Sequence, residues 1–126
     1  MARQIITSDK VAEMTVPLSQ AVRTGNLVFV SGITPFTKDL QVAKGDFGAQ
    51  MRQVMDNIVH ILAEAGTGLD NVVKATVVLT RISDFEEMNR IYREYFGEKD
   101  CPARITIEAP LAHPDFLLEI ECIAEV

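Results

Sequence analysis

The sequence predicts an α+β domain in which two helices lie on one face of a mixed β-sheet. Two segments carry apolar residues at helical spacing, several short segments have the character of strands, and the two kinds of segment alternate along the chain. The 126 residues are a usual length for one domain, so we expect a single domain over residues 1–126. Two helices cannot cover both faces of such a sheet, and one face should therefore stay bare.

The first strands are expected near the N-terminus. Residues 1–15 are polar and irregular, which predicts an edge segment or a loop. Residues 19–23 and 27–31 flank Thr24-Gly25-Asn26, a connection suited to a hairpin. Residues 37–40 are expected to add a short strand or a turn.

Apolar periodicity predicts both helices. The first should cover residues 46–64 and end at Gly66. The second should begin after Ser83, because Glu86 three residues later would complete a capping box. Gly97 should end it, since glycine readily adopts the backbone conformation found after a helix.

Three further strands complete the predicted sheet. Residues 72–80 form the apolar run of a buried strand. Residues 104–108 alternate so that Arg104, Thr106 and Glu108 share one face. Residues 116–124 also alternate, with two glutamates opposite an apolar face.

Arg104 and Glu119 are the unusual residues of the last two strands. An arginine at a strand start and a glutamate between Leu118 and Ile120 are costly to bury without a purpose. If the two strands are neighbours, the guanidinium and the carboxylate reach the same end of the sheet. The alternative is structural: Arg104 would pair with a nearby carboxylate, and Glu119 or Glu121 would face solvent.

Composition excludes several classes of protein. The net charge is −6, and twelve basic residues are scattered among eighteen acidic ones, so we expect no nucleic acid partner. No apolar run approaches the roughly 20 residues that span a bilayer, and the first residues lack the pattern of a signal peptide. The two cysteines, Cys101 and Cys122, lie far apart, which favours a cytoplasmic protein without disulfides.

Metal and cofactor sites are not indicated either. His60 and His113 lack the paired spacing of a zinc site. Neither cysteine has a histidine near it in sequence that would activate a thiol nucleophile. With no phosphate loop and no dinucleotide fingerprint, we expect no metal and no cofactor.

The segment Pro102-Ala103-Arg104, followed by Leu118-Glu119-Ile120-Glu121, resembles the signature of the Rid family, the reactive intermediate deaminases of YjgF type. Further segments match the family in chain order: Ser31-Gly32 with Pro35, residues 50–57, residues 72–77 and residues 88–92. The resemblance covers residues 19–124. It implies a chorismate-mutase-like fold and a homotrimer whose bare sheet faces pack inward, with sites between subunits.

The resemblance also implies roles for individual residues. Arg104 would bind a substrate carboxylate through the two-pronged donor geometry that lysine lacks. Glu119 would hold and activate a water, since a partly buried carboxyl can transfer protons near neutral pH. Ser31 and Gly32 would let a ligand approach the backbone, and Asn89 would line the pocket.

Two positions depart from the family pattern. Leu18 and Thr106 stand where the best-studied subgroup has a tyrosine and a cysteine, so the substrate preference stays open. Thr106 still offers a hydroxyl and its backbone groups to a ligand. Both positions are therefore candidates for substrate binding.

The implied activity is the metal-independent hydrolysis of small imine or enamine acids, such as 2-aminoacrylate and its 2-imino tautomer, to a 2-oxo acid and ammonia. Two alternatives stay open. The pocket can hold a carboxylate metabolite without turnover, as a regulatory module, or the protein can be a catabolic deaminase for an aminomuconate-type substrate. Leu18 and Thr106 leave the first alternative open.

Overall fold

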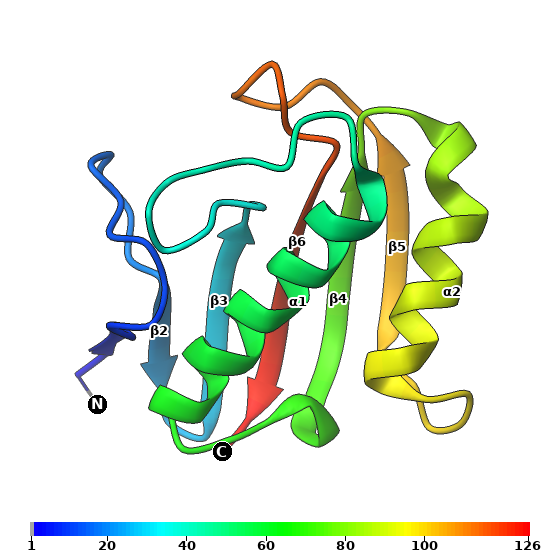
Figure 1. Ribbon diagram of the computed structural model, residues 1–126. Helices are drawn as coiled ribbons and strands as arrows, with labels where there is room; N and C mark the ends of the chain where they lie inside the picture. The colour runs from blue at the N-terminus through cyan, green and yellow to red at the C-terminus, as the bar shows by residue number, and fades with distance from the viewer. Residues whose placement is uncertain (1) are drawn as a thin grey trace.

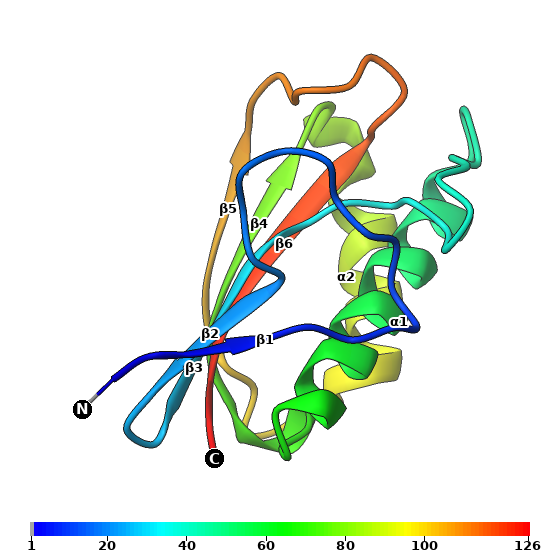
Figure 2. The ribbon, with the colours of Figure 1, turned by 90° about the vertical axis from the view of Figure 1, so that its left-hand side faces the viewer.

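The six strands of the computed structural model form one sheet, and both helices lie on the same face of it (Figure 1). The structure describes residues 2–126, so the first residue of the predicted N-terminal segment lies outside it. The strand order is β1-β2-β3-β6-β4-β5, and all neighbours are antiparallel except β4 and β5. Seen along the sheet, α1 and α2 are on one side and the other side is open (Figure 2).

The predicted elements are present with ends shifted by at most two residues. The strands are β1 (Gln4–Ile6), β2 (Ala21–Thr24), β3 (Leu27–Ile33), β4 (Val72–Leu79), β5 (Ala103–Glu108) and β6 (Leu118–Glu125). The helices are α1 (Phe47–Glu64) and α2 (Phe85–Phe96), and short 3₁₀ turns, Leu69–Asn71 and Ile82–Asp84, precede β4 and α2. The mixed α+β architecture with two helices on one face is confirmed.

Local chemistry explains two of these boundaries. Gly25 has a φ of +59° in the turn between β2 and β3, a conformation that glycine adopts without strain, which confirms the predicted hairpin. At the start of α1, the Asp46 carboxylate accepts a hydrogen bond from the N–H of Ala49 at 3.0 Å. This cap satisfies one of the free N–H groups of the first turn.

The start of α2 differs from the prediction. The capping box at Ser83 and Glu86 is wrong, because the chain first makes a 3₁₀ turn and α2 begins only at Phe85. Asp84 precedes the helix without a side-chain capping bond, and its carboxylate instead accepts from Arg81 Nε at 2.9 Å.

The core lies between the sheet and the two helices. The apolar side of α1 and the inward residues of the central strands are fully enclosed. They include Val28, Met51, Val54, Met55, Ile58, Ile61, Leu62, Val77, Leu118 and Ile120. Burying this much apolar surface is the main source of stability for the domain.

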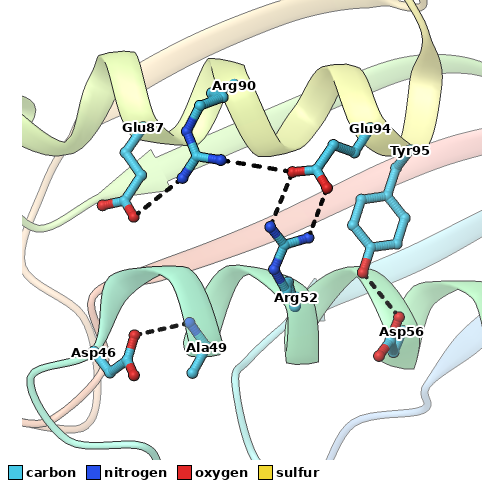
Figure 3. Close-up of polar contacts among 8 residues, drawn as sticks. All are labelled: Asp46, Ala49, Arg52, Asp56, Glu87, Arg90, Glu94 and Tyr95. Atoms are coloured by element: carbon cyan, nitrogen blue, oxygen red, sulfur yellow. Dashed lines mark hydrogen bonds and ion pairs between the residues drawn. The ribbon is translucent and has the colours of Figure 1, made fainter.

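Polar side chains join the outer surfaces of the two helices (Figure 3). Arg52 on α1 donates to both carboxylate oxygens of Glu94 on α2, at 3.1 and 2.9 Å, and this contact lowers the pKa of Glu94. The Tyr95 hydroxyl donates to Asp56 at 3.0 Å. Because water screens these exposed groups, they set the register of α2 along α1 more than they stabilise the fold.

The last two strands, β5 and β6, are not neighbours, so the condition under which Arg104 and Glu119 would reach the same end of the sheet is not met. β4 lies between β5 and β6, with Arg104 paired to Ala75 and Glu119 paired to Val78 on opposite edges of β4. The physical reason is the crossover through α2, which places β5 parallel and adjacent to β4. The other edge of β4 is then free, and β6 inserts between β4 and β3.

The face of the sheet opposite the helices is open to solvent and carries exposed apolar side chains beside the glutamates of β6. Phe29, Val73, Ile105 and Ile107 on this face are between 42% and 51% exposed. An exposed patch of this kind usually marks an interaction surface. The homotrimer that would cover it stays a prediction. Neither α1 nor α2, the helices within residues 2–126, is long and apolar enough to span a membrane.

Candidate active site

Arg104 lies on edge strand β5 and faces α2. Its guanidinium carbon is 4.8 Å from the centre of the Tyr92 ring and 5.9 Å from that of Phe85, and Nη1 is 3.9 Å from Met88 Sδ. Within residues 2–126, no carboxylate forms an ion pair with it. Aromatic faces support a guanidinium without using its N–H donors. Arg104 is therefore not paired with a carboxylate within residues 2–126, and apart from the weak Nη1–H bond that it donates to Met88 Sδ, its donors have no partner among these residues.

A cavity of about 370 Å³ borders Arg104 and is also lined by Asn89, Tyr92 and Cys101. The Tyr92 hydroxyl is buried without a hydrogen-bond partner, and burial raises the pKa of Tyr92 to about 12, against the opposing effect of Arg104. Thr106, two residues along the same face of β5, also has a buried hydroxyl without a partner. Buried polar atoms without partners are rare and often occur at functional sites.

Glu119 lies in a different cavity, of about 420 Å³, which Leu18, Ser31 and Gly32 also line. The loop before β2, the end of β3 and the loop before β6 form it, so segments distant in sequence meet there. Most of the other wall residues are apolar, among them Val11, Met14, Val16, Phe36 and Phe116. An apolar cavity with a few polar groups is typical of a small-molecule site.

Gly32 is positioned directly under the Glu119 carboxyl group. Between Val30 and Ile33 the pairing of β3 with β6 shifts by one residue, as in a β-bulge. A Cβ atom at Gly32 would lie 2.9 Å from Glu119 Cδ and closer still to Oε2, so only glycine leaves room for this carboxyl position. Ser31, beside it, donates its hydroxyl to the Ser19 carbonyl at 2.5 Å, which holds the end of β3 against the preceding loop.

The Glu119 carboxyl has few polar neighbours. Its neighbours across the open face are Val78 and, beyond that strand, Ile107. Burial raises the pKa of Glu119, and the nearby charge of Glu121 raises it further. Glu121 itself is exposed and accepts from the Thr76 hydroxyl at 3.5 Å. Of these two carboxyls, Glu119 is thus the one whose pKa is shifted in the direction that favours proton transfer by a carboxyl group.

The side chain of Gln50 on α1 holds the loop that leads into β6. Its Nε2 donates to the carbonyls of Ala43 and Asp115 at 3.0 and 2.9 Å, and its Oε1 accepts from the N–H of Leu117 at 2.8 Å. Gln50 is completely buried. It thereby fixes the backbone two residues before Glu119.

We expect Gln50→Met to destabilise the protein although it keeps the apolar volume. The change leaves the Leu117 N–H and two carbonyls without their partner. Because these three bonds are only partly buried, water replaces some of them, and each lost bond costs about 1 kcal/mol, the low end of the roughly 1–3 kcal/mol of a fully buried group. Urea denaturation should give a free energy of unfolding lower by roughly 2–4 kcal/mol. Gln41→Met, on an exposed loop, is the matched control and should have little effect. Equal stabilities for the two variants would contradict this role of Gln50.

A single chain does not bring all predicted site residues together. Leu18, Ser31, Gly32 and Glu119 meet in one cavity, whereas Asn89 and Arg104 line the other. Arg104 points towards α2, while Glu119 is on the open face. Their partners on β4 are three residues apart, which is roughly 10 Å along the strand. Because β5 and β6 are not neighbours, the two side chains do not reach the same end of the sheet within one chain.

Sequence reasoning missed several residues of these cavities. Phe85, Met88 and Tyr92 were expected only as the apolar face of a helix, yet they support the Arg104 side chain. His113 was set aside because it lacks a metal-ligand partner, yet it lines the cavity of Glu119. Its position in the sequence, six residues before Glu119, could have indicated that His113 lies near that glutamate.

Comparisons with known proteins agree with the fold. The family model described as Endoribonuclease L-PSP matches residues 9–126. The 3-aminoacrylate deaminase RutC of Acinetobacter baylyi is 36% identical over 127 residues, which cover 100% of both chains. YyfA of Yersinia pestis, a solved structure of the Rid family, matches with a TM-score of 0.94 and 35% identity over 99% of this chain and 100% of that one.

The Escherichia coli protein TdcF, solved with bound serine, matches with a TM-score of 0.89 and 29% identity over 98% of each chain. The six-stranded sheet with two helices is thus the fold of Rid proteins. The chain belongs to the Rid family of YjgF type.

Proposed function

We propose that this protein hydrolyses small imine or enamine acids of the 2-iminopropanoate type to 2-oxo acids and ammonia. The observation that carries the proposal is the unpaired guanidinium of Arg104, supported on aromatic rings beside an open cavity. Such a group binds a substrate carboxylate with two parallel hydrogen bonds. Asn89 borders the same cavity and can contact the ligand held there.

The second half of the chemistry needs a water and a proton carrier. Water adds to C2 of the imine, the nitrogen takes up a proton, and the C–N bond then breaks to release ammonia. The Glu119 carboxyl, with its raised pKa, can orient the water and exchange these protons. Positioning of water and substrate alone can lower the barrier by several kcal/mol.

We infer that the Arg104 cavity and the Glu119 cavity are two half-sites of one active site, and that they meet between subunits. The Arg104 and Glu119 side chains lie on opposite faces of one sheet, so they can act on one substrate only if one copy presents the Arg104 cavity to the Glu119 cavity of the next copy. Two different complementary patches on one chain make a heterologous interface, which closes into a ring when the rotation permits. A homotrimer of this kind would also cover the exposed apolar side chains of the open face.

Two relatives support a small carboxylate ligand. RutC of Acinetobacter baylyi is named a 3-aminoacrylate deaminase, and the substrate in that name is an enamine acid. The TdcF structure contains serine, which is not an imine, and this observation favours a second candidate function: binding of a carboxylate metabolite without turnover. The net charge of −6 argues against the ribonuclease activity in the description of the family model.

The decisive experiment generates 2-iminopropanoate in situ and follows its disappearance with and without the protein. Faster loss with catalytic amounts of protein, together with 2-oxo acid and ammonia in equal amounts, is the result expected of an imine hydrolase. Unchanged loss, with saturable binding of pyruvate or serine by calorimetry, would favour the binding module instead.

Glu119→Gln should slow hydrolysis and also stabilise the free protein above neutral pH. A carboxyl with a raised pKa binds its proton more tightly in the folded state, so stability falls as pH rises from the ordinary carboxyl pKa through the raised value. Glutamine does not titrate and removes this loss. Between pH 5 and pH 8, the free energy of unfolding measured by urea denaturation should therefore fall less for the variant than for the wild type. Glu125→Gln, on the same face of β6, is the control. A pH dependence identical to that of the wild type would contradict the buried carboxyl.

Gly32→Ala should reduce hydrolysis at least tenfold with little loss of stability. The new Cβ displaces the end of the Glu119 side chain, which is flexible, so the carboxyl moves while the fold adapts. Gly68→Ala is the matched control, since a Cβ there meets nothing within 4 Å. Initial rates and thermal denaturation measure the two effects. Wild-type rates in a folded Gly32→Ala protein would argue against the carboxyl position described above.

A further inference from the structure

The cavity beside Glu119 contains few polar atoms that a ligand can use. The amide groups of Gln20 and Asn57 are occupied by hydrogen bonds to other parts of the chain, and the Ser31 hydroxyl donates to a backbone carbonyl. Among the described wall residues, Glu119, Thr34 and His113 have side-chain polar atoms without such bonds. In an apolar cavity, atoms of this kind fix the orientation of the ligand.

His113 is held in a defined orientation. Its Nδ1 accepts a hydrogen bond from the N–H of Asp115 at 3.0 Å. The ring stacks on Phe116 with centroids 4.7 Å apart and meets Phe36 edge-on at 5.7 Å. Because Nδ1 is an acceptor, the neutral imidazole carries its proton on Nε2. Nε2 has no partner among residues 2–126 and is not one of the enclosed polar atoms, so it is an accessible donor.

The cavity is larger than a three-carbon imino acid requires. At about 30 Å³ for each water-sized group, its 420 Å³ hold roughly a dozen non-hydrogen atoms. Even the whole of 2-iminopropanoate, with its six non-hydrogen atoms, would take only about half of that space. The remainder is bounded by apolar residues and by the aromatic group of Phe36, His113 and Phe116.

We propose that His113 determines substrate specificity by donating its Nε2–H to an acceptor at the end of the substrate side chain. The protein would then prefer 2-imino acids with a polar-tipped side chain over equally long apolar ones. This inference rests on the proposed imine hydrolysis. Thr34 does not impose such a preference, because a hydroxyl rotates and serves as donor or acceptor, whereas the Nε2–H of the neutral ring only donates.

The preference for polar-tipped side chains follows from the free-energy cost of leaving the Nε2–H of His113 without a hydrogen-bond acceptor. A bound ligand displaces the water that otherwise accepts from Nε2–H. An apolar side chain leaves the donor unsatisfied, whereas a side chain with an acceptor replaces the lost bond. Sites built around a hydrogen bond discriminate against ligands that lack the matching group.

The test compares His113→Phe with the wild type on two imines, generated in situ from methionine and from methionine sulfoxide. These side chains have equal length and differ by one acceptor oxygen. Phenylalanine keeps the aromatic packing and removes the donor. We expect kcat/KM for the sulfoxide imine to fall about tenfold, as for one neutral hydrogen bond, and kcat/KM for the methionine imine to change less than about threefold. His60→Gln, the matched control at the other histidine, should change neither.

An equal fall for both imines, or no change for either, would overturn the specificity role while leaving the deaminase function intact. If the wild type hydrolyses 2-iminopropanoate but neither of these longer imines, the specificity role is overturned; if it does not hydrolyse 2-iminopropanoate either, the proposed function fails, and ligand binding then tests His113 by itself. In a His60→Gln background His113 is the sole histidine, so its Nε2–H can be followed by ¹H–¹⁵N NMR. The 2-oxo acid of methionine sulfoxide should shift this signal more than that of methionine, and equal shifts would overturn the inference.

Discussion

Arg104→Lys is expected to lower the rate of imine hydrolysis by roughly two to three decades while the fold stays intact. Lysine keeps the positive charge but loses the planar pair of donors that matches a carboxylate. Removing one partner of a desolvated charge pair costs about 2–5 kcal/mol, and each ~1.4 kcal/mol corresponds to one decade of rate. Circular dichroism tests whether the fold is intact, and initial rates on 2-iminopropanoate measure the loss of hydrolysis.

The contacts of Arg104 allow a loss of activity in Arg104→Lys to be attributed to substrate binding. Its guanidinium rests on Tyr92, Phe85 and Met88 rather than on a carboxylate, so the substitution breaks no ion pair within the chain. Arg81→Lys, at an exposed ion pair with Asp84, is the control and should retain wild-type rates. Wild-type rates from a folded Arg104→Lys protein would mean that the carboxylate is held elsewhere.

Sequence reasoning predicted the elements of the fold well, because their signals are local. The alternation in residues 104–108 correctly placed Arg104 and Thr106 on one face and Ile105 and Ile107 on the other. The helical period of residues 46–64 depends on neighbours within a few positions. Such patterns follow directly from backbone geometry.

The order of the strands in the sheet was harder to predict from the sequence. Whether β6 pairs with β5 or with β4 depends on contacts between distant segments, and alternation alone does not distinguish these arrangements. For the same reason the sequence did not reveal that Arg104 and Glu119 face opposite sides. The role of His113 depends on a bond to Asp115 and on rings from two loops, which no spacing rule predicts.

The separation of the half-sites leads to a second large expected effect. Arg104→Lys and Glu119→Gln should each be nearly inactive alone, but a mixture unfolded and refolded together should regain activity. If each site takes Arg104 from one subunit and Glu119 from the next, some mixed sites contain both native residues. Random assembly of equal amounts makes about one quarter of the sites fully native.

An active site formed within a single chain would give a different result in the mixing experiment. If a rearranged single chain supplied both residues, every site would contain one substitution and the mixture would stay as inactive as its components. Sedimentation of the mixture should give a particle of three 14.0 kDa chains, and a wild-type sample refolded in the same way calibrates the recovery. The double variant Arg104→Lys/Glu119→Gln, mixed with wild type, should also give about one quarter of fully native sites by the same statistics. Recovery from the two single variants is therefore the specific evidence that the Arg104 cavity of one subunit and the Glu119 cavity of its neighbour form one active site.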